Sequence, residues 1–299
     1  MHRPMVLPAL ALGACAVLLA ATAYAQPAEV TINDTMVSPE SVTSSADGAI
    51  IFGSTTKGNV YRAAKGAAAA DVWIQASATG LQRVLGVFAD AAHQTLWVCS
   101  SAAPGRGGAP ATGETGVKSF DLSTAAPKGS YAFPGGTGTC NDMAIDKVGN
   151  LYATDTSGAR VLRLKAGATT MDQWAADPLL NSADGIVVMG DGNVYVNTFG
   201  TGTLVKIPIG TDGAAGAPAK LDLSRPLVRP DGMRSVSATR MLLIEGDGHL
   251  DEVSIQATQA EITTLKDGFM GPTAVTLVGN TAYVLEGRTK VTAVPYTAR

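Results

Sequence analysis

The sequence predicts an all-β protein, a six-bladed β-propeller whose blades each have four strands. Short apolar segments recur along the chain, and each is bounded by Gly, Asn, Asp or Ser, as strands between tight turns are. These segments recur with a period of about 40–45 residues, which is typical of propeller blades. No segment beyond the N-terminal stretch keeps the i, i+3, i+4 apolar spacing of a helix over several turns. A β-sandwich is the alternative fold, but it does not account for the period.

The clearest repeat begins at residues 141–146, with the sequence Asn-Asp-Met-Ala-Ile-Asp. A turn at 148–150 leads to a second strand at 151–155, and a further turn leads to a third strand at 159–164. The repeat that begins at Asp184 follows the same plan. The turns contain Gly with Asn or Asp, the residues that tight hairpins favour.

Six repeats are predicted, and they begin near residues 40, 82, 141, 184, 231 and 272. One interval is longer than the others because it contains a Gly-, Pro- and Ala-rich segment, 104–116, which we expect to be a surface loop. The last repeat is short, and the segment 29–33 is predicted to supply its outer strand. Such a strand closes the ring and protects sheet edges that would otherwise be exposed.

Residues 1–25 are predicted to be a cleaved signal peptide, which leaves 26–299 as one propeller domain. Arg3 supplies the positive charge, residues 5–21 are apolar, and Ala23-Tyr24-Ala25 is a small-x-small cleavage site. A retained membrane anchor and a lipid anchor at Cys15 are the alternatives. No later segment has the ~20 apolar residues that span a bilayer, so no membrane span is expected after cleavage. The predicted location is the periplasm or the cell exterior.

Composition and cysteine content bound the partners and the chemistry. The 299-residue chain has a formal net charge of −3, which gives no electrostatic reason to expect nucleic acid binding. Cleavage leaves Cys99 and Cys140, which lie at the edges of strand-like segments in neighbouring repeats. They either form a disulfide in an oxidising compartment or are two small buried apolar side chains.

Four repeat starts carry oxygen-bearing side chains that predict a cation site. The first strand of each propeller blade lines the central channel, so the starts of these strands converge on one mouth. Carboxylates gathered there repel one another unless a hard cation balances them, and Ca²⁺ is the first candidate, with Zn²⁺, Mg²⁺ and Mn²⁺ as others. Asp-Gly and Asn-Asp are also common turn dipeptides, but their recurrence at one phase of the repeat favours a site. The candidate ligands are Glu40, Asn141, Asp184 and Asp231.

The same segments resemble the senescence-marker-protein/gluconolactonase family, the regucalcin-like six-bladed propellers. The resemblance covers nearly the whole mature chain and is carried by Pro39–Val42, Cys140–Asp146, Ala183–Ile186, Arg229–Met233 and Gly271–Thr273. It implies one divalent cation held at the channel mouth.

The resemblance also implies individual roles. Glu40 and Asp231 match direct ligands, Asp231 matches the general base, and Asn141 matches an asparagine that faces metal and substrate. Asp184 stands where the family usually has asparagine, Glu40-Ser41-Val42 stands in place of Glu-Gly-Pro, and Thr139 replaces an arginine that often grips a sugar lactone. These departures weigh against a sugar lactone as the substrate.

The predicted cation site and the resemblance lead to two hypotheses for the function. The first is a metal-dependent hydrolase of a lactone or related ester, a small molecule, with Asp231 and Asn141 as catalytic residues. The alternative is a non-catalytic exported propeller that binds a ligand or a protein partner. A lyase or synthase on a related scaffold is a third reading. The clustered carboxylates favour the hydrolase, and Thr139 with the altered first motif favours the binder.

Overall fold

The computed structural model describes residues 2, 27–103 and 111–297. The predicted signal peptide therefore lies outside the described residues except for His2, and so does most of the predicted surface loop. In the described part the chain is almost entirely β-structure, with one four-residue helix, α1 (Ala76–Thr79), and one 3₁₀ turn, η2 (Pro178–Leu180). The all-β prediction is confirmed. Within these ranges no helix is long and apolar enough to cross a bilayer.

Most sheets are formed by strands that follow one another along the chain and pair antiparallel. Two outer strands are very short, and β18 adds to its sheet by a parallel pairing with β22. The sheets, from inner to outer strand, are β6 (Arg83–Asp90), β7 (Thr95–Ser101), β8 (Gly116–Asp121) and β9 (Pro127–Ala132); β10 (Cys140–Ile145), β11 (Leu151–Asp155), β12 (Arg160–Leu164) and β13 (Asp172–Ala176); β14 (Ala183–Val188), β15 (Asn193–Thr198), β16 (Thr203–Pro208) and β17 (Ala219–Lys220); and β19 (Pro230–Ser235), β20 (Arg240–Glu245), β21 (His249–Gln256), β22 (Gln259–Lys266) and β18 (Asp222–Leu223).

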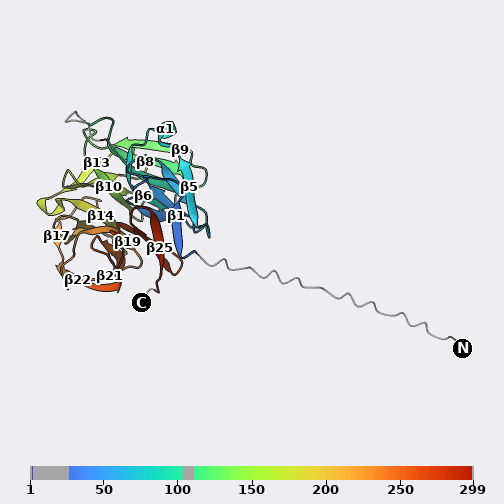
Figure 1. Ribbon diagram of the computed structural model, residues 1–299. Helices are drawn as coiled ribbons and strands as arrows, with labels where there is room; N and C mark the ends of the chain where they lie inside the picture. Colours follow the sequence, from blue (N-terminus) through green and yellow to red (C-terminus); the bar gives the residue numbers. More distant parts are fainter. Residues whose placement is uncertain (1, 3–26, 104–110, 298–299) are drawn as a thin grey trace.

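The two ends of the domain meet in one eight-stranded sheet. Strand β1 (Glu29–Ile32) pairs antiparallel with β25, with Val30 opposite Val291, and its other edge pairs in parallel with β5. It thus lies beside β25, where the segment 29–33 was expected to lie (Figure 1). The remaining strands of this sheet are β2 (Val42–Ser44), β3 (Ile50–Gly53), β4 (Val60–Ala63) and β5 (Ala69–Ile74) on one side and β23 (Ala274–Val278), β24 (Thr281–Glu286) and β25 (Lys290–Pro295) on the other.

The first strands of the sheets lie toward the middle of the molecule (Figure 1). Each contacts the next in chain order, and the last, β23, contacts the first, β2. Apolar side chains fill the space between neighbouring sheets, so that each core cluster draws on two of them; Ala144 and Tyr152 of one sheet, for example, pack with Val194 of the next. The strands in contact around the middle are β2, β6, β10, β14, β19 and β23.

The turns at 146–150 and 191–193, which each contain an aspartate and end in Gly-Asn, have a shared structural reason. Asp146 accepts hydrogen bonds from the backbone N–H of Val148 and of Asn150, and it also accepts the hydroxyl of the buried Tyr152. Asp191 accepts the hydroxyl of Tyr195 in the same way. The aspartate therefore shapes the turn and satisfies a polar group in the core, which explains why the turn and a following tyrosine recur together.

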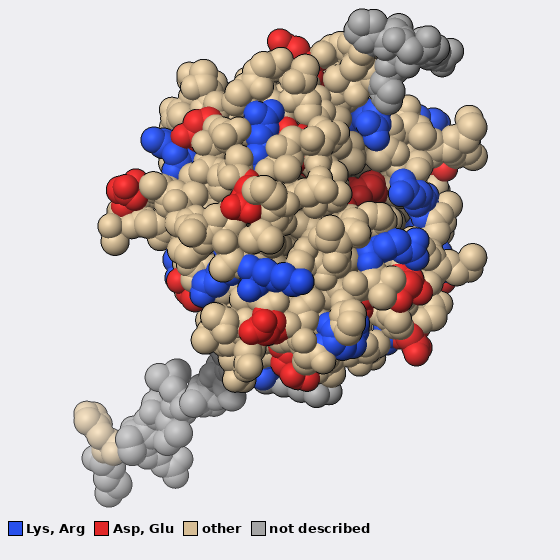
Figure 2. Space-filling view, turned by 90° about the vertical axis from the view of Figure 1, so that its left-hand side faces the viewer, with Lys and Arg blue, Asp and Glu red and all other residues tan. Residues whose placement is uncertain are grey.

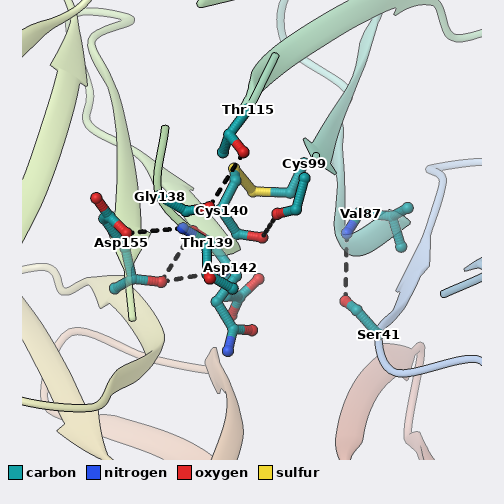
Figure 3. The surroundings of a disulfide bond; sticks show 12 residues. Ser41, Val87, Cys99, Thr115, Gly138, Thr139, Cys140, Asp142 and Asp155 are labelled. Atoms are coloured by element: carbon teal, nitrogen blue, oxygen red, sulfur yellow. Dashed lines mark hydrogen bonds between the residues drawn. A yellow bond between two sulfur atoms is a disulfide. The ribbon is translucent and has the colours of Figure 1, made fainter. Parts of the chain in front are cut away.

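A disulfide joins two neighbouring sheets. Cys99 of β7 and Cys140 of β10 are both buried and are bonded to each other (Figure 3). Nearby, the hydroxyl of Ser101 donates to the carbonyl of Cys140, and the Ser41 hydroxyl accepts from the N–H of Val87 in the next inner strand. Of the two alternatives left open by the sequence, the structure has the disulfide.

Candidate functional site

The pairing of inner and second strands places six residues at one level around the middle of the molecule. In each sheet, one inner-strand residue faces the second strand just before that strand ends, as Met143 faces Ala153 and Met233 faces Leu243. The residue two positions before it in the chain lies at the end of the inner strand that we call the mouth. Counted this way, the six residues are Glu40, Leu85, Asn141, Asp184, Asp231 and Thr273.

Three of these side chains are carboxylates that lie together. Oxygen atoms of Glu40, Asp184 and Asp231 are all within 4.8 Å of one another. Asp184 and Asp231 are each only 6% exposed, and Glu40 is half-buried. Asn141 and Thr273 line the same cavity, and the apolar Leu85 does not. All four predicted site residues are therefore brought together, although they come from four different sheets.

Three of the four site residues lie in strands, so the alternative explanation that the Asn-Asp and Asp-Gly pairs form turns is wrong. Asn141, Asp184 and Asp231 belong to β10, β14 and β19. Their strands each carry a register shift at this point, a bulge that re-aims the side chains next to it. The following glycine serves close packing, because a Cβ on Gly185 would lie 2.4 Å from the carbonyl oxygen of Asp231.

Polar side chains of the second strands satisfy the backbone groups that the bulges leave unpaired. The Thr154 hydroxyl accepts from the N–H of Asp142 and donates to the carbonyl of Asp184. Asn197 accepts from the N–H of Gly185 and donates to the carbonyl of Asp231. Each bridge also ties one inner strand to the next, so the spacing of the carboxylates is held by the scaffold.

Burial and mutual repulsion make these carboxyls hard to ionise. Burial, and then the charge of Asp142, raises the pKa of Glu40 to about 7. Burial and the charge of Glu40 raise the pKa of Asp184 well above its usual range, with Asn141 acting in the opposite direction. Burial, Asp184 and Glu40 do the same to the pKa of Asp231. Without a cation these carboxyls therefore retain protons at a pH where ordinary carboxyls do not.

The donor set fits a hard divalent cation. It consists of carboxylate, amide and hydroxyl oxygens, which Ca²⁺ and Mg²⁺ prefer, and it has no sulfur or imidazole. Two buried oxygens in the same cavity, Thr273 Oγ1 and Asp142 Oδ1, have no hydrogen-bond partner among the described residues. Buried polar atoms normally have a partner, so these two are consistent with a place for an ion or its water.

Sequence reasoning missed three residues of this cavity. Thr273 occupies the sixth position of the level but carries no charge, so it was not predicted as a ligand. Asp142 directly follows Asn141 but was not predicted to take part in the site, and neither was Arg234. A signal was present for Arg234, since it directly follows the Asp-Gly-Met segment of its repeat.

Comparison with known proteins supports the fold only. No family model matches the chain, and no curated protein matches it. Solved structures with a similar fold include a gluconolactonase from Xanthomonas campestris, which is 16% identical with a TM-score of 0.66, the match covering 89% of each chain. A virginiamycin B lyase from Staphylococcus aureus is 12% identical with a TM-score of 0.65, over 89% of this chain and 83% of the lyase. A chain of a nidogen/laminin complex is 16% identical with a TM-score of 0.59, over 80% of this chain and 84% of that one. Propeller-like proteins thus share this architecture, at identities that carry no function with them.

Proposed function

We propose that this protein is a metal-dependent hydrolase of a lactone or related ester, built on a six-bladed propeller whose ring is closed by β1. The contacts that run through six inner strands and return from β23 to β2 support the blade count and the closure. The pairing of β1 with β25 supports the role of the N-terminal strand. The similar fold of a gluconolactonase is consistent with this reaction class.

The convergence of three carboxylates on one cavity, two of them buried and Glu40 half-buried, carries the proposal. Glu40, Asn141, Asp184 and Asp231 would hold the cation, with Ca²⁺ as the first candidate and Zn²⁺, Mg²⁺ and Mn²⁺ as others. A bound cation supplies charge stabilisation to an ester carbonyl and lowers the pKa of water. A group of buried carboxylates that must share protons is costly to keep in a fold, which favours a functional explanation over a structural one.

The side chains of the cavity divide the remaining work. Asp231 takes a proton from the attacking water, a role that suits a carboxyl whose pKa is raised by burial and by the charges of Asp184 and Glu40. Asn141 donates one amide hydrogen to Thr156 at 3.1 Å, and this contact fixes the orientation of the amide. The fixed Asn141 then orients the substrate.

The substrate is a small molecule other than a sugar lactone. At the position where the related family often has arginine, Thr139 supplies only a short side chain, and its N–H donates to Asp155. Lys and Arg side chains are interspersed with Asp and Glu over the surface seen in Figure 2, which gives no basic face for nucleic acid.

Export completes the proposal. Residues 1–25 act as the signal peptide, 26–299 form the single mature domain, and the protein resides in the periplasm or outside the cell. The Cys99–Cys140 disulfide supports this location, because such bonds persist in oxidising compartments.

A non-catalytic binding propeller is the second candidate. One observation favours it: the solved structures with this fold include a nidogen/laminin complex as well as enzymes. Fold alone does not decide between these functions.

The deciding experiment is lactone and ester hydrolysis by metal-stripped protein, with Ca²⁺, Mg²⁺, Mn²⁺ or Zn²⁺ added back in turn. We expect turnover that depends on the cation and is lost in Asp231→Asn. Asp267→Asn is the matched control, because it removes the same charge from an exposed position and should keep full activity. No turnover by folded protein over a broad panel of substrates would favour the binding propeller.

A further inference from the structure

Arg234 crosses the centre of the molecule just beneath the carboxylate cluster. It belongs to β19, yet its Nη2 donates to the carbonyl of Val42 in β2 at 3.0 Å and to that of Val87 in β6 at 3.3 Å. Its guanidinium also lies over the ring of Phe88, 5.6 Å from the ring centre. A single side chain thus links three inner strands that come from separate sheets.

The Arg234 guanidinium faces a fourth carboxylate, Asp142. Nη1 of Arg234 lies 3.7 Å from Oδ2 of Asp142. Asp142 is 5% exposed and lines the same cavity as the three clustered carboxylates. Its other oxygen, Oδ1, is buried and has no hydrogen-bond partner in the part of the chain that the structure describes. One oxygen is therefore held by the arginine while the other remains available to the cavity.

Asp142 is also out of keeping with its counterparts in the other inner strands. Asp142 directly follows Asn141, and the residues at the same position in the other inner strands are small and uncharged. The strands approach one another closely there. A Cβ on Gly86 would lie 2.2 Å from the carbonyl oxygen of Asn141, which shows how little room there is. The counterparts of Asp142 are Ser41, Gly86, Gly185, Gly232 and Ala274.

We propose that Asp142 and Arg234 form a second layer of the cation site, in which Asp142 Oδ1 faces the ion or its water and Arg234 is a positioning residue and fixed counter-charge. The proposal rests on the cation site of the proposed function. Four carboxylates line one cavity, and Arg234 pairs with one of them, Asp142, while Arg83 and Arg288 act on Glu40 from farther away. The arginine keeps the ion-free cluster foldable and moderates the affinity of the site, because its charge repels the ion that the carboxylates attract.

Calcium binding to metal-stripped protein, measured by isothermal titration calorimetry, tests this assignment through the sign of each change. Asp142→Asn should weaken binding about 10- to 100-fold, as loss of an outer-layer partner does. Arg234→Met should tighten binding by about tenfold and lower the melting temperature in EDTA at pH 8. Arg234→Lys keeps the charge and should bind within about threefold of the wild type. The double variant Asp142→Asn/Arg234→Met should return toward the wild-type affinity.

The outcomes separate this inference from the proposed function. If the wild type binds none of Ca²⁺, Mg²⁺, Mn²⁺ and Zn²⁺, the cation site itself is wrong. If the wild type binds but Arg234→Met leaves affinity unchanged or weakens it, Arg234 has only a structural role and the inference falls. Should Arg234→Met fail to fold, Arg234→Lys and Asp142→Asn still decide, since unchanged binding in Asp142→Asn overturns the second layer.

An independent observation concerns the rim of the same mouth. Seven large apolar side chains are exposed among the residues that the structure describes, three of them by more than 70%. Two lie elsewhere: Val72 on the outer strand β5, and Val148 in the β10–β11 turn at the opposite face. The other five lie in connections that enter an inner strand or that follow the end of a second strand, so they share the face of the carboxylates. These five, the apolar rim, are Met36, Leu179, Phe199, Val228 and Met270.

Hydrogen bonds join loops of the rim to the segments that carry Glu40 and Asp184. The N–H of Phe199 donates to Ser182, two residues before Asp184. The N–H of Gly287 donates to the carbonyl of Met270, and the next residue, Arg288, donates to Ser38, two residues before Glu40. Met36 and Met270 are 80% and 77% exposed. These exposed apolar side chains come from loops that share the face of the carboxylates, where they are placed to contact a ligand.

We infer that the substrate carries an apolar body, an alkyl or aryl group that lies on the apolar rim while its carbonyl enters the mouth. This inference names the substrate class of the proposed hydrolase and rests on it. The test is kcat/KM for lactones of one ring size with alkyl chains of increasing length. Full burial of each added CH₂ would raise kcat/KM by about fourfold, until the chain outgrows the rim.

Matched variants separate the rim from the chemistry. Met270→Ser and Phe199→Ser should flatten the dependence of kcat/KM on chain length, while Val148→Ser on the opposite face should keep the wild-type dependence. Hydrolysis without any dependence on chain length overturns the rim assignment alone, whereas no hydrolysis at all overturns the proposed function. Binding to phosphatidylcholine vesicles that is lost in Met270→Ser, together with a flat chain-length series, would assign the rim to a lipid surface and overturn the inference.

Discussion

The metal-free protein should become less stable as the pH rises from 5 to 8, the reverse of ordinary acid denaturation. In the folded state, burial and neighbouring charge raise the pKa of Glu40 from 4.5 to about 7. Between these values the folded protein keeps a proton that the unfolded chain releases, so stability falls as the pH rises. The raised pKa values of Asp184 and Asp231 act in the same direction.

The size of the effect follows from the shift. The rise in the pKa of Glu40 from 4.5 to about 7 corresponds to roughly 3 kcal/mol of folding stability. This stability is present below a pH of about 4.5 and is lost above a pH of about 7. At about 2 °C per kcal/mol for a domain of this length, the melting temperature in EDTA should fall by about 6 °C. Burial also raises the pKa values of Asp142 and Glu245, which adds to the fall. The pKa of Asp34 is lowered to about 2, so its contribution is lost only in stronger acid.

Thermal unfolding followed by circular dichroism in EDTA, at half-unit pH steps, is the assay. Adding Ca²⁺ should remove the fall, because the ion replaces the protons and stabilises the folded state most at high pH. Asp184→Asn removes the charge that most affects Asp231, so it should raise the melting temperature in EDTA at pH 8 while weakening Ca²⁺ binding. A melting temperature in EDTA that stays flat or rises between pH 5 and 8 would refute the reasoning.

Three further predictions concern the scaffold. Replacing Cys99 and Cys140 by alanine should lower the free energy of unfolding by about 4 kcal/mol, since the bond closes a loop with a sequence separation of 41; an unchanged denaturant midpoint would contradict this. Gly185→Ala should destabilise by at least about 2 kcal/mol and weaken Ca²⁺ binding, because its Cβ would meet the carbonyl of Asp231; calorimetry on the variant checks both. Deleting residues 27–33 should expose the edges of β5 and β25 and cause aggregation visible by light scattering, so a monomeric deletion variant would argue against the closing role of β1.

The fold class was predictable because the repeat is local. Each hairpin contains the residues that determine its turn, such as an aspartate, a Gly-Asn pair and the tyrosine that follows them, within about ten residues. The phase of the repeats also located Glu40, Asn141, Asp184 and Asp231 correctly at one level, since equivalent strands place equivalent residues at equivalent heights.

The turn-former alternative failed for a reason that sequence does not display. Asp184-Gly185 has the composition of a turn, yet it lies within β14 at a bulge, and Gly185 is required by the nearness of the next strand. Close approach between strands that are about fifty residues apart leaves no local signature. The disulfide was left open for a similar reason, because bonding depends on how two sheets are placed against each other.

The sequence by itself determined the all-β class, the repeat, and the three carboxylates and one amide at the start of four repeats, because these depend on patterns within single hairpins. Only the tertiary structure decided that Thr273 completes the level, that Arg234 reaches Asp142 beneath it, and that the five residues of the apolar rim are exposed. These are relations between sheets. The hydrogen-bond register between neighbouring strands fixes the position of each residue along its strand. Which side chains meet at the centre depends on how all the sheets pack against one another.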